Sequence, residues 1–334
     1  MARIVVLTPN PAIDVTYRVA EQRLGETVRV ADVSRRPGGK GLNVVAVLRL
    51  LGSPAVALQP LGGAPGRWMA ESLLAAGTEV VVVDAPGDTR TTVAVVDDRT
   101  HPTLYSEPGE ALPGATWRAL ADAVAQHCEA GGFLVLSGSV PPATAAEHVR
   151  HLVVAAHGVG ARVLVDTSGD ALLAAADAGA DIVKPNEAEA LEATGTGAID
   201  AAAAALIARG AGTVVISRGD AGLCAIGADG DAFVQPAVPD VSGNPTGAGD
   251  AATAGLIAAL LRGGDIAEAL RWASVVGAAA VLSPVAGDID PADLRPLADR
   301  LPTGARPTFP ATEPTFPPAP VPVDLANSGA VRKP

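Results

Sequence analysis

The stretch GNPTGAGDAATAGL, residues 243–256, sets a loop of small residues directly before an alanine-rich segment. Gly243, Gly247 and Gly249 allow backbone conformations that other residues avoid, and the segment that follows predicts a helix ending at Gly263. The first amides of such a helix lack internal partners and carry the positive end of its dipole. The loop therefore predicts a site for an anion such as a phosphate group.

Asp250, the acid within this stretch, has two interpretations. A carboxylate beside a bound phosphate is repelled by it, unless its task is to take the proton of an attacking hydroxyl group. Aspartate is also a common N-cap residue, which would give Asp250 a purely structural role. The loop alone favours neither interpretation, so the rest of the chain must decide.

The composition describes a chain that can bury a large core, with 49% apolar residues among 334. The first apolar run, IVVL, is too short for a secretory signal and no segment approaches the ~18 apolar residues of a membrane span, so we expect a cytoplasmic protein without a membrane partner. Cys128 and Cys224 lack a metal-binding spacing, which favours core positions for both. A net charge of −12 without a basic run argues against a nucleic-acid partner.

Lysine is rare in this chain, which has three lysines among 24 basic residues. Two of them, Lys40 and Lys184, lie in the motifs GGKGLN and VKPNEAE. Because lysine carries a compact charge that arginine does not replace, these two positions suggest specific contacts with a ligand.

Short β-branched runs alternate with helix-like segments along most of the chain, which predicts an α/β core with a mostly parallel sheet and helices on both faces, in residues 1–11, 37–87 and 109–301. Residues 12–36 and 88–108 alternate like strands without a helix between them, and we expect them to form a small β-sheet lid. Residues 302–334 are proline-rich and predict a disordered tail. No G-x-G-x-x-G follows the first strand and no P-loop occurs, which argues against dinucleotide-binding and P-loop proteins.

The motifs TPNPAID, GGKGLN, DTRTT, LSGS, VDTSG, KPNEAE, SRGDAG and NPTGAGD occur in this order along the chain. Together they resemble the ribokinase-like carbohydrate kinases of the PfkB family, most closely its phosphosugar branch of 1-phosphofructokinases, tagatose-6-phosphate kinases and minor 6-phosphofructokinases. The resemblance covers residues 3–300. It implies a Rossmann-type core with a β lid, ATP bound along the carboxyl edge of the sheet, and a phosphosugar held between core and lid.

The resemblance also implies roles for single residues. Asp250 matches the general base, and the amides of Gly247, Ala248 and Gly249 match the anion hole for the transferred phosphoryl group. The residues that match the sugar site are Asp14, Gly39, Lys40, Asn43 and Ser139, with Arg90, helped by Lys40 and Arg29, for the substrate phosphate.

On the nucleotide side, Lys184, Asn186, Ser217, Arg218 and Gly219 match contacts with ATP, and Gly247 and Gly249 border the same phosphates. Asn186 and Glu189 match a Mg²⁺ site, with Glu189 acting through metal-bound water. The structural alternative is a helix N-terminus whose dipole is complemented by Glu187 and Glu189, and both interpretations can hold at once.

The motif departs from the family's commoner D-T-x-G-A-G-D, because Asn244 and Pro245 replace its first two residues and Ala251 follows the aspartate. This puts a monovalent-cation site in doubt and leaves the general base unaffected. The sequence predicts an ATP-dependent phosphohexose kinase, foremost a 1-phosphofructokinase, with tagatose-6-phosphate kinase or 6-phosphofructokinase as alternatives. A non-catalytic sugar-phosphate sensor is the alternative of a different class, and we expect a homodimer formed through the lid.

Overall fold

The computed structural model describes residues 2–301, except residues 24, 98, 100, 101, 284 and 286. The predicted tail, residues 302–334, lies outside the described residues. Within the described part of the chain, no single helix is long and apolar enough to span a membrane; helices α6 (Glu187–Thr194) and α7 (Ile199–Ala208) pass that test only as a pair bent by 59°.

A nine-stranded sheet forms the centre of the molecule, in the order β13-β12-β11-β10-β9-β8-β1-β4-β5. All neighbours are parallel except β11 with β12 and β12 with β13. Strands buried on both faces are nearly continuous apolar runs, as IVVL is in β1. The strands are β1 (Ile4–Leu7), β4 (Val56–Leu61), β5 (Val80–Asp84), β8 (Phe133–Ser137), β9 (Arg162–Asp166), β10 (Ile182–Val183), β11 (Thr213–Ser217), β12 (Leu223–Gly227) and β13 (Ala232–Gln235).

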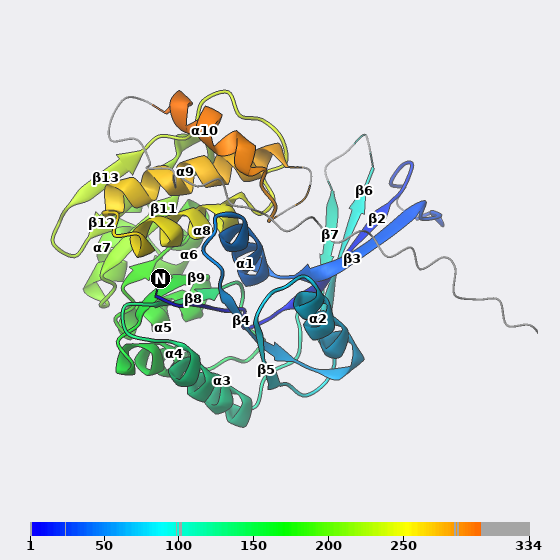
Figure 1. Cartoon of the computed structure of the whole chain (residues 1–334), viewed down its shortest axis with the longest axis horizontal. Helices are drawn as coiled ribbons and strands as arrows, with labels where there is room; N and C mark the ends of the chain where they lie inside the picture. The colour runs from blue at the N-terminus through cyan, green and yellow to red at the C-terminus, as the bar shows by residue number, and fades with distance from the viewer. Residues whose placement is uncertain are drawn as a thin grey trace, which may run out of the picture.

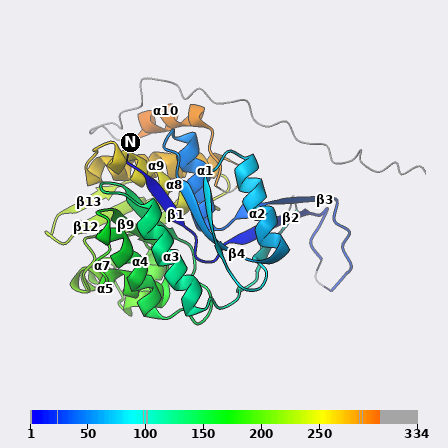
Figure 2. The same ribbon diagram turned by 60° about the horizontal axis from the view of Figure 1, so that its bottom comes forward.

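Helices cover both faces of this sheet, and each face has its own apolar core (Figures 1 and 2). One core includes α1 (Lys40–Leu50), α2 (Gly63–Ala75), α8 (Ala248–Leu261), α9 (Ile266–Leu282) and α10 (Pro291–Arg300). The other includes α3 (Gly114–His127), α4 (Ala146–Gly158), α5 (Gly169–Asp177), α6 (Glu187–Thr194) and α7 (Ile199–Ala208). Cys128 and Cys224 are buried free thiols, as expected of core residues.

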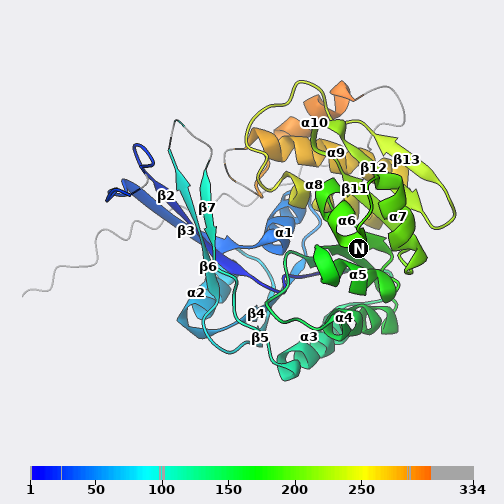
Figure 3. The same cartoon turned by 180° about the vertical axis from the view of Figure 1, so that it is seen from behind.

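A second sheet of four strands, in the order β3-β2-β6-β7, projects from one side of the core (Figures 1 and 3). Its strands are β2 (Ala12–Arg18), β3 (Asp32–Gly38), β6 (Arg90–Val96) and β7 (Thr103–Ser106). The α/β class with a mostly parallel main sheet and a smaller sheet, predicted from the sequence, is confirmed by this architecture. That the smaller sheet acts as a lid stays a prediction.

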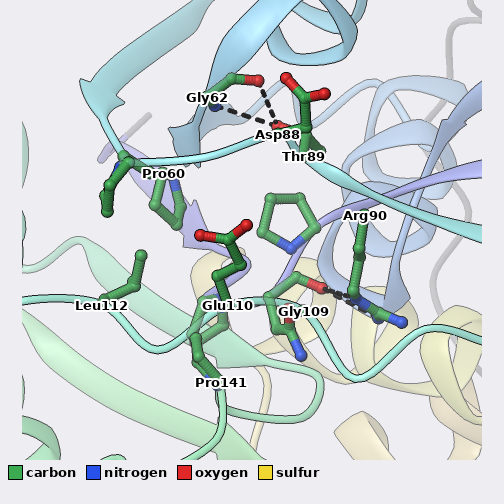
Figure 4. A pocket seen from close by; sticks show the side chains of 14 residues that line it. Pro60, Gly62, Asp88, Thr89, Arg90, Gly109, Glu110, Leu112 and Pro141 are labelled. Atoms are coloured by element: carbon green, nitrogen blue, oxygen red, sulfur yellow. Dashed lines mark hydrogen bonds between the residues drawn. The ribbon is translucent and has the colours of Figure 1, made fainter.

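Two sets of hydrogen bonds connect the small sheet to the core. The Thr89 hydroxyl accepts from the Gly62 amide at 3.0 Å, and the Thr89 amide donates to the Gly62 carbonyl at 3.0 Å (Figure 4). The guanidinium of Arg90 donates to the carbonyl of Asn10 at 3.0 and 3.1 Å, and both residues line a small cavity at the junction of the two sheets. The start of β6 is therefore held both to the turn that precedes α2 and to the loop between β1 and β2.

Candidate functional site

Four adjacent strands of the main sheet end in buried polar side chains, which we call the polar row: Thr8, Ser137, Asp166 and Lys184. The residue two positions before each of them is apolar and belongs to the core beneath α1 and α8. Because side chains alternate along a strand, the four face that same side, where α1 and α8 begin. The polar row thus lies at the carboxyl edge of the sheet, the usual ligand-binding edge of an open α/β fold.

Asp166 is the centre of a buried charge network. Its carboxylate lies 2.9 Å from the ammonium of Lys184 and 3.9 Å from that of Lys40, and it accepts a hydrogen bond of 2.7 Å from the Thr253 hydroxyl. Burial alone would raise the pKa of Asp166, but the charges of Lys184 and Lys40 and the hydrogen bonds outweigh it, so this pKa lies below its usual value. Asp166 is therefore ionised at neutral pH.

Asp250 lies in the first turn of α8, with 6% of its surface exposed. The side-chain amide of Asn43 donates a 2.8 Å hydrogen bond to its Oδ2. Burial, followed by the charge of Asp166, raises the pKa of Asp250 to about 7, against the opposing effects of Asn43, Lys40 and Lys184. A carboxyl group that titrates near neutral pH can exchange protons under working conditions.

The N-cap of α8 is Gly247, in the left-handed region with a φ of 83°, and no side chain caps this helix. The interpretation of Asp250 as an N-cap is therefore wrong. The amide of Ala248 donates to the carbonyl of Pro245 at 3.2 Å. A Cβ added to Gly249 would meet nothing within 4 Å, so open space borders the helix start next to Asp250.

Lys40, the first residue of α1, extends toward α6. Its ammonium lies 3.4 Å from Oε1 of Glu189, in addition to its contact with Asp166. Burial alone would lower the pKa of Lys40, but the surrounding carboxylates Asp166, Glu189 and Asp250 raise it above its usual value. Lys40 thus carries a positive charge between the predicted sugar and metal sites.

Asn186 and Glu189 form a capping box at the start of α6. The Asn186 side chain accepts from the Glu189 amide at 2.8 Å, and Oε2 of Glu189 accepts from the Asn186 amide at 2.9 Å. The expected helix start with acidic residues in its first turn is thus confirmed, and it takes the form of a capping box. It leaves Oε1 of Glu189, which faces Lys40, as the carboxylate oxygen available to a ligand.

The other residues of the predicted nucleotide site lie close to this capping box. Ser217 ends β11 and forms an isolated parallel β-bridge with Asn186. The guanidinium of Arg218 lies 3.9 Å from Oε2 of Glu187. Gly219 begins a short 3₁₀ turn with a φ of 54°. Lys184 differs, because its buried ammonium contacts Asp166 and is not exposed to bulk solvent.

On the sugar side, Asp14 lies at the near end of the small sheet. Its Oδ2 is 3.5 Å from the guanidinium of Arg36, its cross-strand neighbour. Burial raises the pKa of Asp14, although Arg36 and Arg90 oppose that effect. A Cβ at Gly38 would lie 2.2 Å from this carboxyl group, so Asp14 packs directly on the Gly38 backbone.

Most donors of Arg90 already have protein partners. Besides the Asn10 carbonyl, its guanidinium donates to the Ser106 hydroxyl and to the Glu107 carbonyl, both at 2.8 Å. Burial lowers the pKa of Arg90. Ser139, by contrast, is exposed, and its hydroxyl is 3.5 Å from the Asn10 side-chain amide. Gly39 precedes α1 with a φ of 105°, a conformation that favours glycine.

Arg29 is the predicted site residue that lies apart from the others. It is exposed in the connection between β2 and β3. The register pairs Ala12 with Gly38 at the end of the hairpin near the core and Arg18 with Asp32 at the far end. Six residue steps of about 3.3 Å separate these ends, so roughly 20 Å of strand lies between Arg29 and the sugar loop.

Three residues that contact members of the candidate site were given no role by the sequence prediction: Asp166, Arg36 and Thr253. Asp166 had a usable signal, because an acid that directly follows the buried run VLV marks the carboxyl edge of a strand. Arg36 and Thr253 have no such signal, since arginine in a strand and threonine in a helix are ordinary residues.

The sequence profile of the pfkB family carbohydrate kinases matches residues 5–293. The 1-phosphofructokinase of Xanthomonas campestris pv. campestris is 37% identical over 216 residues, which are 62% of this chain and 68% of that protein. The ATP-dependent 6-phosphofructokinase isozyme 2 of Escherichia coli is 36% identical over 195 residues, which are 57% of this chain and 62% of that protein.

A crystal structure of phosphofructokinase-2 from Escherichia coli in complex with potassium superposes with a TM-score of 0.83 at 30% identity, over 89% of this chain and 98% of that one. Another structure of the same relative is its tetrameric inhibited form. With the family profile and the shared fold, these likenesses confirm the predicted resemblance: the chain belongs to the pfkB family of carbohydrate kinases, phosphotransferases that act on a sugar hydroxyl group.

Proposed function

We propose that this protein is an ATP-dependent phosphohexose kinase that converts fructose 1-phosphate to fructose 1,6-bisphosphate. The observation that carries the proposal is Asp250, a carboxyl group with a pKa of about 7 next to the N-terminus of α8. A sugar-phosphate sensor has no need of such a base. Tagatose 6-phosphate and fructose 6-phosphate are the alternative substrates, and the names of the relatives favour phosphofructokinase chemistry.

In this mechanism the Asp250 carboxylate accepts the proton of the attacking sugar hydroxyl. Asn43 fixes the carboxylate by donating to Oδ2, which leaves the other oxygen for the sugar hydroxyl. The amides of Gly247 and Gly249, at the positive end of the α8 dipole, stabilise the charge that develops on the transferred phosphoryl group, and the amide of Ala248 would join them on leaving the Pro245 carbonyl. These donors are fixed by the helix, so they require little reorganisation during the reaction.

The nucleotide would lie along the carboxyl edge, with Ser217, Arg218 and Gly219 near its phosphates and ribose. Lys184 acts there through Asp166, because its ammonium is already paired. The donor set fits a magnesium ion held through water, since Asn186 and Oε2 of Glu189 are engaged in the cap and Oε1 remains. When bound, magnesium supplies neutralisation of the phosphate charge.

The sugar would lie between α1 and the small sheet, with Asp14, Gly39 and Asn43 near its hydroxyl groups. Lys40 and Arg90 would face the substrate phosphate, Arg90 also serving to hold the Asn10 backbone. Ser139 would supply a hydroxyl group from the loop after β8. Arg29 lies too far along the hairpin to reach this site from within the same chain.

We also propose that residues 12–36 and 88–108 act as the lid, and that two chains associate through it. Leu104 and Tyr105 on the edge strand β7 are 59% and 57% exposed, an apolar edge that a second copy would cover. Cytoplasmic location is part of the same proposal. Sedimentation analysis of the Leu104→Lys variant tests the association, because the wild type is expected to dimerise and this variant to be monomeric.

Replacing Gly38 by alanine is expected to raise the KM for the sugar at least about tenfold, because the new Cβ would displace the Asp14 carboxyl group. The KM for ATP should change little. Gly158→Ala is the matched control, since a Cβ at this exposed glycine meets nothing within 4 Å. Steady-state kinetics with each substrate varied in turn makes the comparison. An unchanged sugar KM in the Gly38 variant would remove Asp14 from the proposed sugar site.

Phosphorylated hexoses are expected to exceed free sugars in kcat/KM by about a hundredfold or more, since several charge-assisted contacts with the substrate phosphate are lost in the free sugar. Coupled ADP-release assays with fructose 1-phosphate, tagatose 6-phosphate, fructose 6-phosphate, fructose, tagatose and ribose measure this ratio. The Asp250→Asn protein, purified in parallel, controls for contaminating kinases. A free sugar preferred over all three phosphohexoses would contradict the proposed substrate class.

A further inference from the structure

Thr253 has a fully buried side chain on α8, one turn after the glycine loop. Its hydroxyl oxygen lies 2.7 Å from Oδ2 of Asp166 and 3.0 Å from the carbonyl of Gly249. The carboxylate is the stronger acceptor because it is charged. Apart from Asp250 in the first turn, the residues of α8 are small or apolar, so this hydroxyl is a buried polar group in an otherwise apolar stretch of helix.

A buried hydroxyl group destabilises a protein unless it forms a hydrogen bond, and valine has nearly the same shape without that cost. The hydroxyl of Thr253 is therefore explained by what it binds. One of its partners is Asp166, the residue that holds the ammonium groups of Lys184 and Lys40. Through Gly249 it contacts the anion-hole turn itself.

We propose that Thr253 is a positioning residue for phosphoryl transfer, which fixes the Asp166 carboxylate so that Lys40 and Lys184 keep their places beside the base. The inference rests on the proposed role of Asp250. Thr253 joins the end of a strand in the polar row to α8, the helix that carries both the base and the anion hole. It therefore sets the position of this helix relative to the strand end.

The electrostatic consequence has a definite direction. Asp250 is surrounded by Asn43 and Lys40 from α1, by Asp166 from β9 and by Lys184 after β10, while Glu189 of α6 faces Lys40. The donated hydrogen of Thr253 partly neutralises the Asp166 charge, which Lys184 and Lys40 keep ionised. Without that hydrogen, Asp250 experiences more negative charge and loses its proton at higher pH.

Two matched pairs of proteins test the proposal: wild type against Thr253→Val, and Thr253→Ser against Thr253→Ala. The members of the first pair have nearly the same shape, and the members of the second differ by the hydroxyl oxygen. Within each pair we expect the hydroxyl to raise kcat about tenfold, the scale of one hydrogen bond to a charged group, with KM values within about twofold. The acidic limb of the profile of kcat against pH should move to higher pH in the Thr253→Val and Thr253→Ala proteins.

The proposal is overturned if the members of each pair have the same kcat and pH profile, or if they differ in melting temperature alone. Should the valine protein fail to fold, the Ser and Ala pair still decides, because alanine is compatible with any helix interior. Asp250→Asn in the same assay separates the two levels of inference. Loss of activity there with no effect at Thr253 rejects only the positioning role, whereas activity retained in Asp250→Asn rejects the proposed function.

Discussion

Replacing Asp250 by asparagine is expected to lower kcat by about a hundredfold or more, because the proposed general base is removed, while the KM values for sugar and ATP stay within a few-fold. Asparagine has the shape of aspartate and can still accept the hydrogen bond from Asn43. The measurement is steady-state kinetics at pH 8, where the wild-type carboxyl group is ionised. A variant within threefold of wild type would show that Asp250 does not take the proton.

The same substitution is expected to stabilise the folded protein. The pKa of Asp250 is about 7 in the fold and near 3.9 in the unfolded chain, so the fold binds this proton more tightly. The stability contribution of this group is fully present below pH 3.9 and is lost as the pH rises toward 7. Above that range, ionised Asp250 costs about 2 to 4 kcal/mol, which the asparagine variant avoids.

Urea unfolding of both proteins between pH 4 and 8 measures this effect. The advantage of the asparagine variant should be near zero at the acidic end and should grow until about pH 7. A constant difference across this range would mean that Asp250 is not the titrating group. Gain of stability together with loss of activity would identify Asp250 as a residue that is retained for chemistry at a cost to the fold.

Asp166→Asn is expected to destabilise the protein by about 3 to 5 kcal/mol, because it leaves the buried ammonium of Lys184 without its carboxylate. It should also move the acidic limb of the kcat profile to lower pH, since the Asp166 charge that raises the pKa of Asp250 is gone. Asp166→Asn is thus expected to destabilise the protein, whereas Asp250→Asn stabilises it. It is also expected to move the acidic limb to lower pH, whereas Thr253→Val moves it to higher pH.

Asp177 provides the matched control for this variant. It also forms ion pairs of 2.9 Å, with Arg150 and Arg209, but all three side chains are substantially exposed. Asp177→Asn should therefore cost no more than about 1 kcal/mol. Equal losses for the two variants in urea unfolding would show that burial does not set the strength of the Asp166 network.

The sequence was most informative where a backbone conformation and a polar residue are specified together. The glycine loop before α8 predicted both the helix start and the place of Asp250, because few alternatives satisfy a left-handed residue followed by free amides. The order of strands and helices followed from alternation of apolar runs for the same local reason. The helix start near Asn186 was expected in the same way, whereas the capping box of Asn186 and Glu189 was found only in the structure, although their spacing of three residues is typical of one.

The partners of charged side chains could not be predicted in this way. Lys184 looked like a phosphate ligand, but strand register places it beside Asp166, in a different segment of the chain. The family resemblance implied that Arg29 helps Arg90, yet hairpin register puts it at the far end of the small sheet. Register depends on pairing between distant segments, which neither motif contains.

The hydrogen bonds of Arg90 give this side chain a structural role in addition to the one proposed for it in substrate binding. One side chain holds the Asn10 loop and the end of β7, so a replacement at position 90 would remove these contacts together with the proposed contact to the substrate phosphate. Ser139 is exposed and has a single weak neighbour. A change of sugar preference made at position 139 would therefore leave the backbone contacts intact, whereas one made at position 90 would have to meet two requirements at once.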